Sequence, residues 1–560
     1  MNVYINDEKL SKTIAKKLSK ISEEKIVERI WNKDYTVWDD NPGEISNRLG
    51  WLDSVETTSK AVSEINEFVQ SVIKEGFTNA LLMGMGGSSL APEVFRLTFG
   101  VKAGYLDLAV IDSTHPEAVK EFSDSLEFEK TLFIVSTKSG GTVETISFMK
   151  YFYNKTLKEL GEDNAGKHFA AITDPGSGLE EMAKELNFRK IFLNDPNIGG
   201  RFSALSLFGM VPAALVGVDL NQFLTKTKMM VEECKNNANN SAVELGVILG
   251  VLTEEGINKV TFITSPEIRC FGAWVEQLVA ESTGKNGKGI LPVDLEEVLD
   301  PDFYSKDRLF IYIKMKNDST YDTHISALKG ADFPIIEIEL KDFYDLGKEY
   351  FRWEFATVVA GWALIIQPFD QPNVESAKVV AIKMMDKYIE KGELPELNLN
   401  FTEDGISVSG NIKSDNLKDA LNEFLQNVTV GKSYVAIHAY LKLEKETTNQ
   451  LQSIRTAIQK KFKVATTVGY GPRFLHSTGQ LHKGDKGNGL FIQIIGKPNL
   501  DLPIPDVSQS NESSISFGVL IKAQVMGDRE ALVNNSRDVL TLDLETDLQK
   551  NLRYIEDLLI

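Results

Sequence analysis

One polar stretch combines the side chains and the backbone freedom that binding a phosphate group requires. Val135–Thr145 reads V-S-T-K-S-G-G-T-V-E-T; it follows the apolar run Leu132–Val135 and leads into a predicted helix over Val143–Tyr153. Glycine lets the backbone approach a ligand closely, and a helix N-terminus presents unpaired N–H groups to an anion. The stretch predicts a cradle for a phosphate monoester, and a polar turn without a ligand is the alternative. The candidate residues are Ser136, Thr137, Lys138, Ser139, Gly140, Gly141 and Thr142.

A second glycine loop upstream favours the phosphate interpretation. Gly84–Ser89 reads G-M-G-G-S-S and follows another short apolar run. The dinucleotide fingerprint needs glycine at its first, third and sixth positions, and Ser89 stands at the sixth, so that motif is not matched. A glycine loop with hydroxyls suits a single phosphate better, and Gly87 and Ser88 are its candidates. Two such loops at the carboxyl ends of strands in one sheet can converge on one anion.

Two further segments carry side chains suited to charge stabilisation and proton transfer. Arg201 follows a pair of glycines that ends at Gly200, so its planar fork can reach into a crowded site, although a surface arginine fits the same spacing. Gln277 and Glu281 are four residues apart on a predicted helix over Gly272–Ser282 and share one face. A glutamate beside the glycine-rich turn that follows can act as a general base, whereas most helix glutamates are solvated.

Lysine and histidine candidates come later in the chain. Lys378 lies in the first turn of a predicted helix over Glu375–Lys391, where a positive charge opposes the helix dipole. That placement suggests a function, but a surface position explains it equally well. His476 and His482 share one glycine-rich segment, and a histidine there is suited to acid–base work. A neutral surface histidine is the alternative, especially for His482.

The elements that must position these residues follow an alternating pattern. Residues 1–78 are predicted to be mostly helical, and from there short apolar runs alternate with helical patterns, which indicates parallel sheets covered by helices. Leu394–Asp404 is the best candidate for a linker, and Asn499–Ser514 is predicted to be an exposed loop. The expected strands are Ala80–Met83, Leu106–Ile111, Leu132–Ser136, Phe169–Thr173, Lys190–Leu193, Val260–Thr264, Leu309–Ile313, Ile335–Ile338, Ile406–Ser409, Tyr434–Ala439, Val464–Thr467 and Leu490–Ile495.

Composition narrows the class of protein. The chain has 560 residues, enough for two or three domains, and a net charge of −19, which argues against nucleic acid or a membrane surface as partner. An anionic substrate therefore needs a locally basic site. Cys234 and Cys270 are the two cysteines and have no metal-ligand spacing, so we expect a reduced, cytoplasmic setting. The N-terminus has no apolar signal region, and we expect no membrane span.

Five motifs in order along the chain resemble those of glucose-6-phosphate isomerases. The sequence is most similar to the isomerase half of bacterial transaldolase/glucose-6-phosphate isomerase fusions, from about residue 40 to the C-terminus, and no transaldolase barrel is expected in it. The motifs lie at Gly84–Pro92, Ser136–Thr145, Gly199–Ser206, Gln277–Gly289 and Phe369–Lys378. The resemblance implies an α/β fold with two SIS-type (sugar-isomerase) three-layer α-β-α sandwiches with parallel sheets, plus a smaller C-terminal α/β unit. The expected division is 1–78 helical, 79–255 first SIS domain, 256–393 second SIS domain, and 405–560 the C-terminal unit with the histidine loop.

The resemblance also implies roles, residue by residue. Arg201 would steady the charge of an intermediate, Glu281 would be the base that moves a proton between C1 and C2, and His476 and Lys378 would open the sugar ring. The implied phosphate and substrate contacts are Gly87, Ser88, Thr137, Lys138, Ser139, Thr142, Gly200 and Gln277. The implied reaction interconverts glucose 6-phosphate and fructose 6-phosphate through a cis-enediol, a step of glycolysis and gluconeogenesis. No cofactor and no metal are expected, and the implied partner is a sugar phosphate.

The order of the residues departs from the family in one respect. His476 comes after Lys378 and far beyond Glu281, whereas in the usual order the histidine follows the glutamate closely. We expect that a relocated segment supplies the histidine within the same chain, where ordinary members take it from a neighbouring subunit, so that a monomer or a homodimer is possible. Two alternatives to the function are an isomerase of another sugar phosphate, such as mannose 6-phosphate, and a non-catalytic regulator that binds sugar phosphates.

Overall fold

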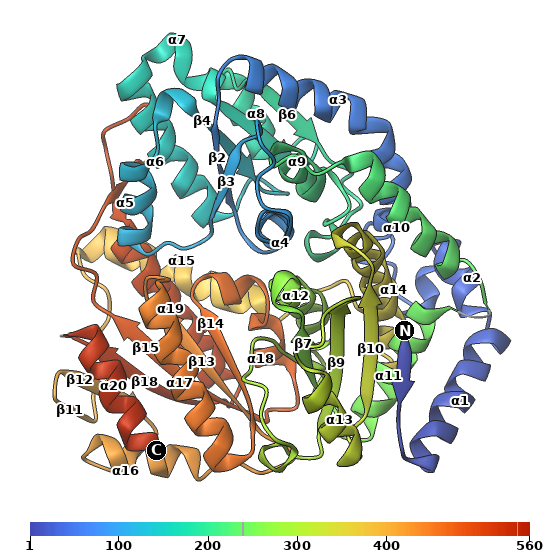
Figure 1. The fold of residues 1–560 in the computed structure, drawn as a ribbon. Coiled ribbons are helices and arrows are strands. Elements are labelled where there is room, and N and C mark those ends of the chain that lie inside the picture. The colour runs from blue at the N-terminus through green and yellow to red at the C-terminus, as the bar shows by residue number, and fades with distance from the viewer. Residues whose placement is uncertain (238–239, 546) are drawn as a thin grey trace.

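Three β-sheets form the framework of the chain (Figure 1). The computed structural model describes residues 1–237, 240–545 and 547–560. Within that part of the chain, no helix is long and apolar enough to cross a membrane. The sheets confirm the predicted α/β class with mainly parallel strands.

The first sheet holds both predicted phosphate loops. Its five strands are all parallel, in the order β3-β2-β4-β5-β6. They are β2 (Asn79–Gly84), β3 (Asp107–Ile111), β4 (Thr131–Ser136), β5 (Phe169–Thr173) and β6 (Lys190–Leu193). Along β4, Leu132 and Ile134 pack into one hydrophobic cluster and Phe133 and Val135 into another, so both faces of the sheet are covered. Continuous apolar runs form such strands because neither face meets water.

Helices from two parts of the chain cover this sheet (Figure 1). Those of the first unit are α4 (Leu90–Phe99), α5 (Pro116–Ser125), α6 (Val143–Leu160), α7 (Glu162–Ala165), α8 (Gly178–Glu185), α9 (Leu207–Leu215) and α10 (Leu220–Cys234). The N-terminal region adds α3 (Ser54–Lys74) to this cover, whereas α1 (Glu8–Glu23) and α2 (Ile26–Trp31) lie beside the second sheet, where Trp31 packs on Phe351 and Phe355. The apolar pattern over Leu10–Ile30 is split into α1 and α2 because Lys25 has a positive φ of 54°.

The second sheet has the order β1-β10-β9-β7-β8. Its strands are β1 (Asn2–Tyr4), β7 (Lys259–Thr264), β8 (Leu291–Val293), β9 (Arg308–Met315) and β10 (Ile335–Leu340), and its helices are α11 (Ser241–Glu254), α12 (Phe271–Thr283), α13 (Asp322–Gly330) and α14 (Leu346–Leu364). The two short strands β1 and β8 were not predicted. β1 is antiparallel to β10, so the first residues of the chain close an edge of this sheet.

The third sheet belongs to the C-terminal unit and has six strands in the order β11-β12-β18-β15-β13-β14. They are β11 (Phe401–Glu403), β12 (Ile406–Gly410), β13 (Tyr434–Tyr440), β14 (Ala465–Tyr470), β15 (Gly489–Gly496) and β18 (Asp538–Leu544). The helices are α15 (Val374–Lys391), which leads into the unit, α16 (Leu417–Leu425), α17 (Lys445–Phe462), α18 (Gly479–Gly484), α19 (Phe517–Asn534) and α20 (Leu548–Leu559). The unpredicted β18 lies in the middle of the sheet, and β11 lies inside the predicted linker.

The C-terminal unit shares hydrophobic cores with both other units. On one side, Phe517 and Leu520 of α19 pack into the cluster that covers β4 and α6. On the other, Phe491 of β15 and Leu481 of α18 pack with Val293 of β8. The predicted loop over Asn499–Ser514 contains the short strand β16 (Pro503–Ile504), which pairs with β17 (Ile515–Ser516). The packing of the C-terminal unit against the other two units brings the histidine-bearing segment to the carboxyl ends of the first sheet.

Candidate active site

All twelve residues predicted for the site line one cavity of about 540 Å³. The cavity opens between the carboxyl ends of β2 and β4, helix α12, the start of α15 and the turn Arg473–His476 of the C-terminal unit. The residues brought together are Gly87, Ser88, Thr137, Lys138, Ser139, Thr142, Gly200, Arg201, Gln277, Glu281, Lys378 and His476. They come from all three units of the chain.

The glycines of the phosphate loops allow unusually close backbone contacts. A Cβ atom added to Gly87 would lie 1.9 Å from the carbonyl oxygen of Gly200. The first phosphate loop can therefore contact the segment that precedes Arg201 only because residue 87 is glycine. Gly140 has a φ of 72°, and a Cβ there would lie 2.3 Å from the backbone nitrogen of Leu179. Thr142 stands at the N-cap position of α6 without capping the helix through its side chain. The free N–H groups of this helix end and the neighbouring hydroxyls can bind an anion.

Replacing Gly87 with Ala is expected to lower kcat/KM by about fivefold to a hundredfold, since overpacking of this kind costs about 1–3 kcal/mol. The added methyl group must push the first phosphate loop away from Gly200. Steady-state kinetics with a sugar phosphate measures the change. The matched control is Gly330→Ala, because a Cβ at Gly330 meets no atom within 4 Å. Equal kinetics for both variants would contradict the tight contact between the loops.

The ammonium group of Lys138 is held at the edge of the cavity. It pairs with Asp174 and donates to the carbonyl oxygen of Pro196 at 2.8 Å. Burial raises the pKa of Asp174, and the neighbouring Lys138 opposes that rise. The lysine therefore contributes positive charge to the phosphate loop from a fixed position.

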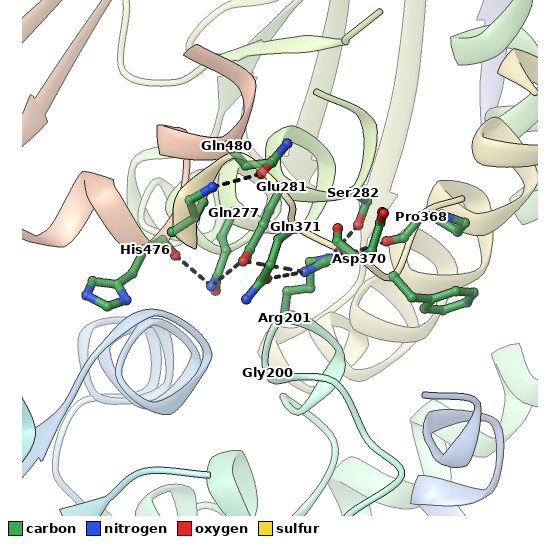
Figure 2. Close-up of polar contacts among 12 residues, drawn as sticks. Gly200, Arg201, Gln277, Glu281, Ser282, Pro368, Asp370, Gln371, His476 and Gln480 are labelled. Atoms are coloured by element: carbon green, nitrogen blue, oxygen red, sulfur yellow. Dashed lines mark hydrogen bonds and ion pairs between the residues drawn. The ribbon is translucent and has the colours of Figure 1, made fainter. Parts of the chain in front are cut away.

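Arg201 is the buried cation of the site, with 4% of its surface exposed. Its guanidinium donates to Ser282 Oγ at 2.8 Å, to Gln371 Oε1 at 2.9 Å and to the carbonyl oxygen of Pro368 at 2.8 Å (Figure 2). Burial lowers the pKa of Arg201, and the nearby carboxylates of Glu281 and Asp370 act in the opposite direction. These contacts fix the plane of the fork beside the cavity.

Glu281 lies within reach of that cation. One of its carboxylate oxygens is 3.4 Å from Arg201 Nη1, and the other accepts a hydrogen bond from Gln277 Nε2 at 3.1 Å (Figure 2). Gln277 also donates to the backbone oxygen of His476 at 2.7 Å and so connects α12 to the C-terminal unit. A carboxylate in the wall of a cavity next to a fixed positive charge can remove a proton from carbon and stabilise the charge that results.

His476 is the histidine of the cavity, and His482 is not. His476 Nε2 lies 3.0 Å from Glu144 Oε1, which leaves Nδ1 as the ring nitrogen for acid–base chemistry. Glu144 is buried, which by itself raises its pKa, but the charge and hydrogen bond of His476 together with Lys378 hold that pKa below its usual value. His482 is fully buried against His438, at 3.2 Å, and burial with that neighbour holds its pKa well below 6.5. The alternative assignment to His482 therefore has no geometric support.

Lys378 lies near the start of α15, one residue beyond its first turn because the helix begins at Val374, and it is in the wall of the same cavity. The start of α15 is held by Gln480 of α18, whose Oε1 accepts from the backbone nitrogens of Asn373, at 2.9 Å, and Val374, at 3.2 Å. The C-terminal unit thus positions the lysine as well as supplying the histidine.

Sequence reasoning missed three residues that hold the site together. Glu144 lies inside the quoted phosphate motif, and Gln371 inside the last motif, but nothing in the sequence indicates their partners. Lys285, in the glycine-rich turn after α12, is buried and donates to the backbone oxygen and to Oδ1 of Asp370 at 2.5 and 2.6 Å. Burial, and then the charge of Arg201, lowers the pKa of Lys285 to about 8.

In the described part of the chain, no cluster of three or more His, Cys, Asp or Glu side chains is arranged to hold a metal ion.

Comparison with known proteins agrees with this geometry. Residues 41–291 match the family model of phosphoglucose isomerase. A probable glucose-6-phosphate isomerase of Methanococcus maripaludis is 29% identical over 383 residues, covering 60% of this chain and 84% of the relative. A glucose-6-phosphate isomerase of Campylobacter jejuni is 26% identical, covering 60% and 91%. The crystal structure of a glucose-6-phosphate isomerase from Chlamydia trachomatis shares the fold with a TM-score of 0.57 at 17% identity, covering 68% of this chain and 87% of that one.

Two mainly parallel sheets between helices, with glycine-rich loops gathered at one cavity, define an α/β fold shared with a glucose-6-phosphate isomerase structure. Residues 41–291 are similar to the phosphoglucose isomerase family, and the relatives named glucose-6-phosphate isomerase resemble this chain over 60% of its length.

Proposed function

We propose that this chain interconverts glucose 6-phosphate and fructose 6-phosphate, a reaction of glycolysis and gluconeogenesis. One observation carries the proposal: Glu281 lies beside the buried Arg201 in the cavity that both glycine loops and His476 also line. The family match and the names of the relatives support the same substrate pair. They do not favour an isomerase of another sugar phosphate or a non-catalytic regulator.

Each step of the proposed mechanism has a residue in the cavity. The phosphate of the substrate binds the hydroxyls and N–H groups of the two loops. His476 protonates the ring oxygen, and Lys378 assists the opening of the ring. Glu281 then removes the proton from C2 and returns it at C1, while Arg201 stabilises the negative charge of the enediolate between these two transfers.

A coupled assay tests the proposed function. Purified chain receives fructose 6-phosphate, and glucose 6-phosphate is detected through its dehydrogenase. We expect turnover without an added cofactor. Absence of turnover together with tight binding of a phosphorylated sugar acid would contradict the proposal and favour the regulator.

We further propose that the active unit is a single chain. The support is geometric, because His476 and Glu281 belong to the same chain and line the same cavity. Size-exclusion chromatography with light scattering is expected to show an active species at 62.4 kDa, and activity per chain should not change on dilution. Activity that disappears as a dimer dissociates would contradict a site completed within one chain.

The remaining expectations also stay proposals. A cytoplasmic location is supported by Cys234 and Cys270, which are both free thiols. The division at residues 78 and 393 is supported by the three sheets, but α11 (Ser241–Glu254) packs against α14 of the second unit, so that unit begins before residue 255; β1 also adds the start of the helical region to the second sheet.

A further inference from the structure

A buried glutamine of the C-terminal unit contacts the carboxylate that holds the site histidine. Gln524 of α19 donates from Nε2 to Glu144 Oε1 at 2.7 Å. The same oxygen lies 3.0 Å from His476 Nε2. Gln524 is 5% exposed and Glu144 6%, so water does not substitute for these contacts. The three side chains come from α19, from α6 of the first unit and from the turn that precedes α18.

Thr114 determines which way the glutamine amide faces. This fully buried threonine, between β3 and α5, donates from Oγ1 to Gln524 Oε1 at 2.8 Å. An ionised carboxylate only accepts hydrogen bonds, so the group that faces Glu144 must be the NH₂ of the amide. The amide oxygen then faces the threonine, and the two contacts require the same orientation.

The carboxylate has space to turn if the glutamine is lost. A second cavity of about 180 Å³ adjoins the first, and both apolar and polar side chains line it, several of them from α15 and α19. Glu144, His476 and Gln524 form part of its wall. Its charged members besides Glu144 are Lys378, Lys483 and Asp528. Lys483 is paired with Asp528 at 2.7 Å, whereas the charge of Lys378 already acts on Glu144; Lys378 would attract a carboxylate that is no longer held by Gln524, and the carboxylate would then leave His476.

We propose that Gln524, oriented by Thr114, is a positioning residue for the isomerase reaction. It holds Glu144 against His476, so the ring keeps one proton on Nε2 and points Nδ1 at the ring oxygen of the substrate, to which the imidazolium form gives its second proton. The inference rests on the proposed function for its kinetic part, whereas the state of the histidine ring can be measured without any turnover.

Gln524→Met tests the inference, because methionine is similar in length but donates no hydrogen bond. With cyclic sugar phosphate, kcat is expected to fall about tenfold or more, since a hydrogen bond to a charged group is lost. KM and the affinity for an open-chain phosphorylated sugar acid should stay within about twofold, since neither needs ring opening. Lys522→Ala, on the exposed face of the same helix, is the matched control and should leave all three values unchanged.

Nitrogen NMR of labelled histidine provides the second readout. The chain has six histidines, and a His476→Asn sample assigns the signal of interest. In the wild type the neutral ring is expected with its proton on Nε2, and in Gln524→Met as a mixture of both tautomers. An unchanged tautomer in the variant would overturn the inference, whether kcat falls or not. If Gln524→Met does not fold, Thr114→Val leaves the amide in place without its anchor and should shift the tautomer in the same direction; no shift would likewise overturn it.

Discussion

Replacing Glu281 with Gln is expected to abolish most of the isomerase activity. A correctly placed general base accelerates a reaction by about 10²- to 10⁴-fold, so kcat should fall by at least about 10²-fold. Glutamine keeps the size of the side chain and can still contact Gln277, now 3.1 Å from the carboxylate, but it cannot take a proton from C2. The coupled assay with fructose 6-phosphate measures the loss, and thermal unfolding tests that the fold is intact.

The matched control for this variant is Glu267→Gln, a carboxylate on the exposed surface of the same unit. It should retain the wild-type kcat. Binding of a phosphorylated sugar acid to the Glu281 variant separates the base from the binding site, and we expect the phosphate loops to bind it still. Turnover within tenfold of the wild type would mean that another group is the base.

Replacing Arg201 with Ala is the second change with a large expected effect. Removing a fixed donor from a developing negative charge typically costs about 10²- to 10³-fold in kcat. The variant also leaves the carbonyl oxygens of Pro368 and Asp370, now 2.8 and 3.2 Å from Nη2, without their donor, so some loss of stability is expected. The coupled assay and thermal unfolding record the two effects separately.

Chemical rescue distinguishes the role of the charge from that of the packing. Added guanidinium ion can occupy the space that the side chain of Arg201 leaves, and a partial return of kcat is expected because the cation is restored beside Glu281. Arg553→Ala, at a solvent-exposed arginine of α20, is the control that should need no rescue. Full activity of the Arg201 variant at a temperature where it is folded would show that the intermediate does not depend on this cation.

The predictable part of the site is the part that short stretches of sequence encode. Both phosphate loops follow apolar runs that form buried strands, so their place at the carboxyl ends of one sheet could be predicted. The choice between His476 and His482 could not, because the two histidines are six residues apart in one glycine-rich segment. Only the packing of α18 against Tyr434 and Phe491 places His482 inside the core.

Contacts between distant residues account for what the sequence did not reveal. Glu144 was visible in a motif, but its partner lies 332 positions away. β18 was missed because charged or polar residues (Asp538, Thr541 and Asp543) interrupt its apolar positions; its place in the sheet comes from pairing with β12 and β15. β8, of three residues, is too short for a periodic signal and depends on its pairing with β7.

The long separation between Glu144 and His476 has a consequence for biosynthesis. The ribosome adds about 5–20 residues each second, so the first two units can be complete many seconds before the last strands of the third sheet exist. Until α19 and the Arg473–His476 turn dock, a nascent chain holds the phosphate cradle and the base but lacks both His476 at the cavity and the Gln480 contacts that position Lys378. Such a chain can bind sugar phosphates without converting their cyclic forms. Catalytic activity therefore appears only when the C-terminal unit docks at the end of folding, and a chain that stops folding before that step is inactive.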